Sequence, residues 1–168
     1  NLGAMGLSVK FQPPVARPSA PMILGVGRLV AKKGFADLVR ALSALKELRI
    51  ACRCVIIGQG REEHPLRTLA SELGVDDMIE FAGARHHEEV RNTMHESTVL
   101  CLPCLRANDG NQDALPTVLL EAMAIGLPVV STRLSGIPEI VDSERDGILV
   151  EPGDPEQLAS ALARVLAD

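Results

Sequence analysis

The sequence has few aromatic residues and no excess of positive charge. Tryptophan and tyrosine are absent from its 168 residues, and phenylalanine occurs three times. There are 17 lysine and arginine residues against 22 aspartate and glutamate residues, a formal net charge of -5. Nucleic-acid-binding surfaces need clustered positive charge, and those for single strands also need aromatic rings on which bases stack. We therefore expect no nucleic-acid partner.

Long apolar runs are also missing. Every apolar stretch is broken by glycine, proline or charge before it reaches the roughly 20 residues that a membrane span needs. Residues 1–9 lack the basic start and apolar centre of a secretory signal peptide. The contents of 46% hydrophobic and 23% charged residues are those of an ordinary globular domain. We expect one acidic, cytoplasmic domain, since 168 residues suit a single domain.

Cysteine is scarce, with four residues. Cys52 and Cys54 fall in one expected strand, and Cys101 and Cys104 flank the end of another. The spacing Cys101-Leu-Pro-Cys104 is that of a redox pair, but such a pair uses a helix that begins after the first cysteine, and a loop follows here. Cys-x-Cys on a strand suits zinc poorly. We expect buried thiols in a reducing compartment rather than a redox or zinc site.

The first 21 residues differ from the rest of the chain. The stretch Gln12–Pro21 is rich in proline and has no periodicity, which is typical of an extended linker. We interpret residues 1–21 as a connection between domains, or as residues foreign to the natural protein. The folded domain is expected over residues 22–168.

From Met22 onward, apolar runs alternate with stretches of helical periodicity. Strands are expected at 22–27, 51–57, 78–81, 99–103, 128–131 and 147–150. Helices are expected at 34–49, 62–73, 86–96, 116–125, 137–141 and 155–166. Continuous apolar strands between amphipathic helices are typical of a parallel sheet covered on both faces. We expect an α/β domain with a doubly wound, six-stranded, Rossmann-like parallel sheet, whose ligand lies beyond the carboxyl ends of the strands.

The loop after the first strand contains glycines and two cations. Gly25 and Gly27 allow a close backbone approach, and Arg28 and Lys33 precede the next helix. A guanidinium and an ammonium group together suit a diphosphate. Val30 stands where Gly-x-Gly-x-x-Gly has its third glycine, which argues against a nicotinamide dinucleotide. An ordinary turn with solvated charges is the alternative.

Three further segments favour a structural interpretation when each is taken alone. The stretch Gly58-Gln-Gly60-Arg61 again places small residues and a cation after a strand, as many turns do. The stretch from Ser131 to Glu139 reads as a turn into a short helix. The cluster His86-His87-Glu88-Glu89 is expected to be a solvated helix start rather than a metal site.

The loop before the helix at 116–125 is the most informative. Glu121 lies among aliphatic residues of that helix, where a carboxylate needs a hydroxyl or a cation as partner. The backbone amides of Leu115, Thr117 and Val118 can hold an anion at the helix start, with help from the helix dipole. Asp113 precedes them and would face a ligand above the sheet. The alternatives are an acid at a helix N-terminus for Asp113 and a salt bridge to a neighbouring helix for Glu121.

Taken in order, these segments resemble the family-4 (group 1) glycosyltransferases. The motifs are Gly27-Arg28 with Lys33-Gly34, Gly58-x-Gly60, an acid eight residues before Glu121-Ala-Met-Ala, Pro128-Val-Val-Ser-Thr and Gly136-Ile-Pro-Glu-Ile-Val. The resemblance covers residues 22–168 and implies the C-terminal, donor-binding half of the B-type glycosyltransferase fold. Residues 10–21 then correspond to the connection between domains. The segments at 108–116 and 131–139 are most similar to exopolysaccharide and lipopolysaccharide enzymes.

The resemblance also implies roles for individual residues. Arg28 and Lys33 would act catalytically by neutralising the donor diphosphate, and Glu121 would hold the ribose hydroxyls. Asp113 would contact the donor sugar as a third catalytic residue, one methylene shorter than the glutamate of the family. The remaining substrate-binding positions are Gly27, Gly60 and the helix-start amides of Leu115, Thr117 and Val118, which would take the distal phosphate.

The activity implied is that of a retaining, metal-independent transferase without a cofactor, in agreement with the lack of an Asp-x-Asp pair in the sequence. It would move a sugar from a nucleotide-diphosphate sugar to a glycan or lipid-linked acceptor. Its partner would be an N-terminal acceptor domain, which could bring the full-length protein to the inner face of the membrane. Without that domain we expect donor binding but no transfer. The alternatives are a nucleotide-sugar epimerase of similar architecture and a non-catalytic nucleotide-binding or interaction module.

Overall fold

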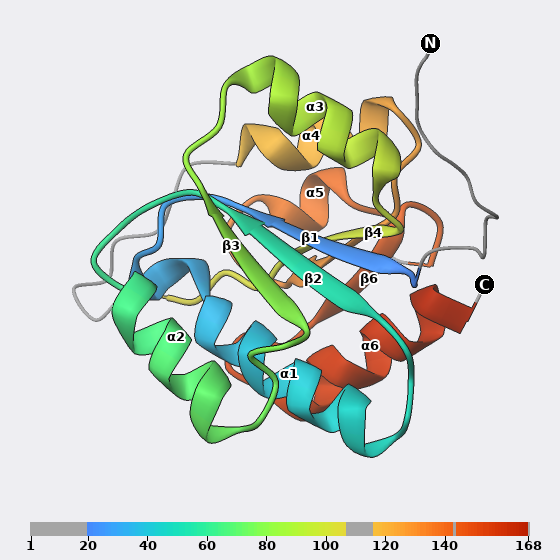
Figure 1. Ribbon diagram of the computed structural model, residues 1–168. Coiled ribbons are helices and arrows are strands. Elements are labelled where there is room, and N and C mark those ends of the chain that lie inside the picture. Colours follow the sequence, from blue (N-terminus) through green and yellow to red (C-terminus); the bar gives the residue numbers. More distant parts are fainter. Residues whose placement is uncertain (1–19, 107–115, 143, 168) are drawn as a thin grey trace, which may run out of the picture.

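The computed structural model describes residues 20–106, 116–142 and 144–167, which form an α/β domain around one parallel sheet (Figure 1). The sheet has six strands in the order β3-β2-β1-β4-β5-β6, and every neighbouring pair is parallel. The predicted fold class is therefore confirmed. The strands are β1 (Met22–Val26), β2 (Arg53–Ile57), β3 (Ile79–Gly83), β4 (Val99–Leu102), β5 (Val129–Thr132) and β6 (Gly147–Val150).

Helices cover both faces of the sheet. On one face lie α1 (Phe35–Glu47), α2 (Glu63–Glu72) and α6 (Pro155–Ala167), and on the other lie α3 (His87–Glu96), α4 (Thr117–Ala124) and α5 (Ile137–Ile140) (Figure 1). All six expected helices are present. The 3-10 helix η1 (Ala31–Lys33) was not expected from the sequence, because three residues are too few to show periodicity.

The core lies between the sheet and these helices. Leu38, Leu42 and Leu45 recur three and four residues apart on α1, so they share one face and are fully buried. Helix α6 packs beside α1 and buries Leu158 and Leu162 in the same layer. The strands are apolar along their length because both faces of the sheet are covered.

The strand order places a topological switch point between β1 and β4. These two strands are neighbours, with Ile23 opposite Val99 and Leu24 opposite Leu100. From them the chain winds outward in opposite directions, toward β3 and toward β6. The connections that leave β1 and β4 diverge at this point, and a ligand of such a sheet binds there, beyond the carboxyl ends of the strands. The segments directly after β1 and β4 therefore border the expected ligand position.

The four cysteines are buried thiols outside any disulfide bond, as expected. Burial raises the pKa of the Cys54 and Cys101 thiols well above the ordinary value. The residues directly after Cys101 complete β4 and enter a loop rather than a helix. Within the part of the chain that the structure describes, no helix is long and apolar enough to cross a membrane.

Candidate functional site

The loop from Gly27 to Gly34 is bonded to the segment that follows β2. The amide of Gly27 donates to the carbonyl of Ile57 at 3.0 Å, and that of Leu29 donates to Gln59 at 3.0 Å. In return, the amide of Glu62 donates to the carbonyl of Leu29 at 2.9 Å. Three backbone hydrogen bonds thus fix the start of the loop in which the sequence predicts a diphosphate site.

Two glycines in this region lie too close to a neighbouring backbone to carry a side chain. A Cβ atom on Gly60 would lie 2.5 Å from the carbonyl oxygen of Leu29. Gly34 has a φ of +74°, and its Cβ would lie 1.8 Å from the carbonyl oxygen of Pro103 in the loop after β4. These close approaches explain on structural grounds why both positions are glycine. They come in addition to the predicted contact of Gly60 with the substrate.

The loops after β1 and β4 are joined directly. The amide of Leu105 donates to the carbonyl of Lys32 at 2.8 Å. At the end of β5, the buried hydroxyls of Ser131 and Thr132 donate to the carbonyls of Leu102 and Cys104 at 2.7 and 2.9 Å. From the sequence, Ser131 was expected only as the end of a strand and the start of a turn, and this role was missed. These bonds fix where the loop after β4 leaves the sheet.

The two predicted phosphate-binding cations stand at the carboxyl end of β1. Arg28 is exposed directly after Gly27. The hydrocarbon stem of Lys33 runs back past Gly27, since a Cβ built on Gly27 would meet its Cδ and Cε atoms at 3.4 Å. Folding of the loop through η1 therefore brings the stem of Lys33 back to the glycine beside Arg28.

Helix α4 begins at the same edge of the sheet, because it follows β4. Thr117 at its start is exposed and Val118 is half-buried. The first amides of any α-helix have no partner within the helix and carry the positive end of its dipole. The amides of Thr117 and Val118 lie in this first turn, where the sequence predicts anion binding. The predicted residues Asp113 and Leu115 lie outside the described residues.

Glu121 is not enclosed by the aliphatic residues of its helix. Its side chain is 38% exposed, because Leu119 and Ala122 are the buried residues of α4. An oxygen of its carboxylate lies 3.2 Å from Nε2 of His87 on α3. The alternative expectation, a salt bridge to a neighbouring helix, fits this contact, which is an ion pair when His87 is protonated. The carboxylate remains accessible to a ligand.

The histidines at the start of α3 are exposed, as expected, but they are not equivalent. His86 caps the helix, with its amide donating to Oε1 of Glu89 at 3.2 Å. His87 instead reaches Glu121. This pair was not expected from the sequence, since the two residues belong to separate helices. The described residues contain no group of three histidine, cysteine or acidic side chains that could hold a metal ion.

Comparison with known proteins fits this arrangement. The family model described as "Glycosyl transferases group 1" matches residues 9–168. The chain belongs to the group 1 glycosyltransferases. A protein of Escherichia coli (strain K12) that carries the name of a colanic acid biosynthesis glycosyltransferase, WcaL, is 40% identical over 162 residues, or 95% of this chain. The amylovoran biosynthesis glycosyltransferase AmsK of Erwinia amylovora is 38% identical over 143 residues, or 85% of this chain.

Solved structures of glycosyltransferases share the fold. The lipopolysaccharide outer core galactosyltransferase WaaB matches with a TM-score of 0.78 and 26% identity, over 92% of this chain and 42% of its own. WaaG, a glycosyltransferase involved in lipopolysaccharide biosynthesis, matches with a TM-score of 0.77 and 27% identity, over 90% of this chain and 39% of its own. The predicted resemblance to exopolysaccharide and lipopolysaccharide enzymes is confirmed.

This group 1 glycosyltransferase chain spans only part of its relatives. The match covers 40% of the length of WcaL and 35% of the length of AmsK. The matched part of this chain includes both loops at the switch point and the whole of α4.

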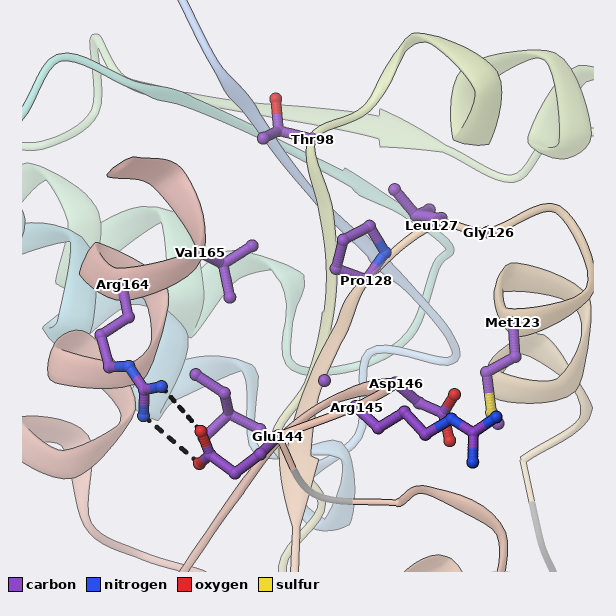
Figure 2. A pocket seen from close by; sticks show the side chains of 12 residues that line it. Thr98, Met123, Gly126, Leu127, Pro128, Glu144, Arg145, Asp146, Arg164 and Val165 are labelled. Carbon is purple, nitrogen blue, oxygen red and sulfur yellow. Dashed lines mark hydrogen bonds and ion pairs between the residues drawn. The ribbon is translucent and has the colours of Figure 1, made fainter. Parts of the chain in front are cut away.

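A cavity of about 380 Å³ lies at the opposite, amino edge of the sheet (Figure 2). Thr98, Pro128 and Asp146, which directly precede β4, β5 and β6, contribute to its wall. Figure 2 shows Glu144 beside Arg164. Two guanidinium nitrogens of Arg164 lie 2.7 and 3.3 Å from the two carboxylate oxygens of Glu144. This hydrogen-bonded ion pair lowers the pKa of Glu144. The cavity lies away from the switch point, so we place it outside the candidate donor site.

Proposed function

We propose that the chain binds a nucleotide-diphosphate sugar at the carboxyl edge of its sheet, as the donor side of a retaining glycosyltransferase. One observation carries the proposal. The cationic loop of Arg28 and Lys33 and the start of α4 both lie beside the β1–β4 switch point. Both supply positive potential, as the diphosphate of a donor requires.

The roles follow from the charge that develops during transfer. When the bond between the anomeric carbon and the diphosphate oxygen breaks, negative charge grows on the leaving nucleotide diphosphate. Arg28 and Lys33 stabilise that charge, and the amides of Thr117 and Val118 hold the distal phosphate. Cationic side chains thus take the place of a metal ion, and the proposed reaction needs no cofactor.

Glu121 and Asp113 are assigned to the two sugars of the donor. The accessible carboxylate of Glu121 accepts hydrogen bonds from the ribose hydroxyls. Asp113 precedes α4 in the sequence and contacts the transferred sugar. Two observations support these assignments: the family membership, and the spacing of Asp113 eight residues before Glu121.

The proposed acceptor is an intermediate of polysaccharide synthesis. WcaL and AmsK carry names that place them in colanic acid and amylovoran biosynthesis. We assign to this protein a similar step, the transfer of a sugar to a glycan or lipid-linked acceptor in exopolysaccharide or lipopolysaccharide synthesis. The acceptor-binding residues are assigned to a domain outside this chain, because the relatives are more than twice as long as the matched part.

Isothermal titration with UDP, GDP and ADP tests donor binding directly. We expect one of the three to bind with an affinity well above that of its nucleoside, because most of the attraction is to the phosphates. Failure of all three would favour a non-catalytic interaction module. Binding of NAD in their place would favour an epimerase-like enzyme.

A further inference from the structure

Glu121 on α4 is contacted by a residue from the neighbouring helix α3. The Nε2 atom of His87, the first residue of α3, lies 3.2 Å from one carboxylate oxygen of Glu121. Helices α3 and α4 lie on the same face of the sheet, and both begin at its carboxyl edge (Figure 1). The pair therefore stands at the border of the proposed donor site.

Packing alone does not fix the carboxylate of Glu121. A cavity of about 250 Å³ opens between α3 and α4, and its wall is formed by His87, Arg91, Met94, Glu121, Ala124 and Ile125. A glutamate beside open space can adopt several side-chain rotamers, and ordering it costs conformational entropy. The imidazole, whose Nε2 lies 3.2 Å from one carboxylate oxygen, favours one of these orientations.

The imidazole of His87 has two potential partners at the same atom. A guanidinium nitrogen of Arg91 lies 3.3 Å from Nε2, on the side chain one turn further along α3. A ring nitrogen carries either a proton or a lone pair, so Nε2 either donates to Glu121 or accepts from Arg91. When Nε2 carries the proton, it occupies one acceptor position of the carboxylate. The other oxygen of Glu121 remains available to a ligand hydroxyl.

We infer that His87 is a positioning residue for the nucleotide, which orients the Glu121 carboxylate to accept hydrogen bonds from the ribose hydroxyls. The inference rests on the proposed function, specifically on the ribose role of Glu121. The side chains of His87 and Glu121 are 62% and 38% exposed, and a polar contact so accessible contributes little to folding. A variant that lacks the imidazole should therefore fold normally.

The test compares two nucleotides that differ only in the groups that Glu121 binds. The probes are whichever of UDP, GDP and ADP binds the chain, and its 2′,3′-dideoxy analogue. In calorimetric titrations, His87→Ala should weaken binding of the ribonucleotide about two- to fivefold, the scale of an exposed ion pair. It should leave binding of the dideoxy analogue unchanged. His87→Gln, whose amide can still donate a hydrogen bond, should restore most of the loss.

Two further variants separate the positioning role from other effects. His95→Ala is the matched control, since His95 is an exposed histidine near the other end of α3. It should change neither affinity. The double variant His87→Ala with Glu121→Gln should bind no more weakly than Glu121→Gln alone, because His87 acts through Glu121.

The outcomes distinguish this inference from the proposed function. Equal weakening of both nucleotides by His87→Ala would overturn the positioning role. The positioning role would also be overturned if His87→Ala left the affinity for the ribonucleotide unchanged while Glu121→Gln weakened it selectively. That result would leave the ribose role of Glu121 intact. If Glu121→Gln had no effect on either nucleotide, the ribose role itself would be wrong, and the role of His87 with it.

Discussion

A Cβ atom on Gly58 would lie 1.8 Å from the carbonyl oxygen of Gly27. The two glycines follow β2 and β1, which are neighbours in the sheet, and Gly27 also donates a hydrogen bond to Ile57. The first turn of the cationic loop therefore rests directly on the backbone of Gly58. The position of Arg28, which directly follows Gly27, therefore depends on this contact as well as on the loop's own sequence.

Gly58→Ala should therefore destabilise the domain. The added methyl group must displace one of two backbones, so we expect a loss of about 1–3 kcal/mol, the usual range for overpacking. Urea unfolding monitored by circular dichroism measures it. Gly136→Ala is the matched control, because Gly136 has a negative φ and no atom within 4 Å of a built Cβ. Similar losses in the two variants would contradict the close contact.

The cations of the loop should act on the phosphates and not on the nucleoside. Arg28→Ala and Lys33→Ala should each weaken nucleoside diphosphate binding by about 1.5–3 kcal/mol, the range for hydrogen bonds to charged groups. Binding of the matching nucleoside should barely change. Calorimetric titration of both ligands gives the difference, with Arg53→Ala, an exposed arginine at the start of β2, as control. Equal losses of binding free energy for the nucleotide and the nucleoside would show that the loop has only a structural role.

The four cysteines should be unreactive in the native chain. Burial raises the pKa of Cys52, Cys54 and Cys101, so these thiols remain protonated at pH 8, where an ordinary thiol is partly ionised. Cys104 is buried as well. Labelling with Ellman's reagent should be slow before denaturation and should then reach all four thiols. Rapid native labelling of Cys101 and Cys104 would instead support a redox pair.

Catalysis is expected to need more than this chain. Transfer requires groups on both sides of the anomeric carbon, and correct orientation alone can supply several kcal/mol of the barrier. The 168-residue chain should therefore release no nucleotide from UDP-glucose, UDP-galactose or GDP-mannose. Fusion to a preceding domain of about 170–200 residues, an ordinary domain size, should restore turnover. Sugar transfer by the chain alone at an ordinary enzymatic rate would contradict the two-domain account.

Local patterns in the sequence were enough to predict the elements of the fold. Uninterrupted apolar strands such as Val99–Leu102 indicate burial on both faces, and this burial requires helices on each side of a parallel sheet. The order of the strands does not follow from such patterns, because it depends on contacts between distant segments. The 3-10 helix at Ala31–Lys33 was not predicted, because it is too short to show a sequence pattern.

The candidate site could be predicted only in part. Arg28 and Lys33 follow a strand that is easily recognised, so their place at the carboxyl edge was clear from the sequence. Glu121 was assigned to the ribose by the family resemblance, and the sequence could not show that its carboxylate is 38% exposed. Its contact with His87 joins two helices and has no local signature. The contact of Gly58 with Gly27 also has no local signature. The spacing of the glycines alone could not show whether Gly58 is needed for a backbone contact or for a ligand contact.

The central claim is that a nucleotide diphosphate binds at the carboxyl edge of the sheet. Amide NMR spectra of the ¹⁵N-labelled chain, titrated with UDP, GDP and ADP, test it most directly. We predict saturable shifts over Gly27–Gly34 and at Thr117, Val118 and Glu121 for one of the three. Gly126 and Gly147, beside the cavity at the amino edge, should not shift. Shifts confined to that cavity, or no shifts with any of the three nucleotides, would contradict the claim.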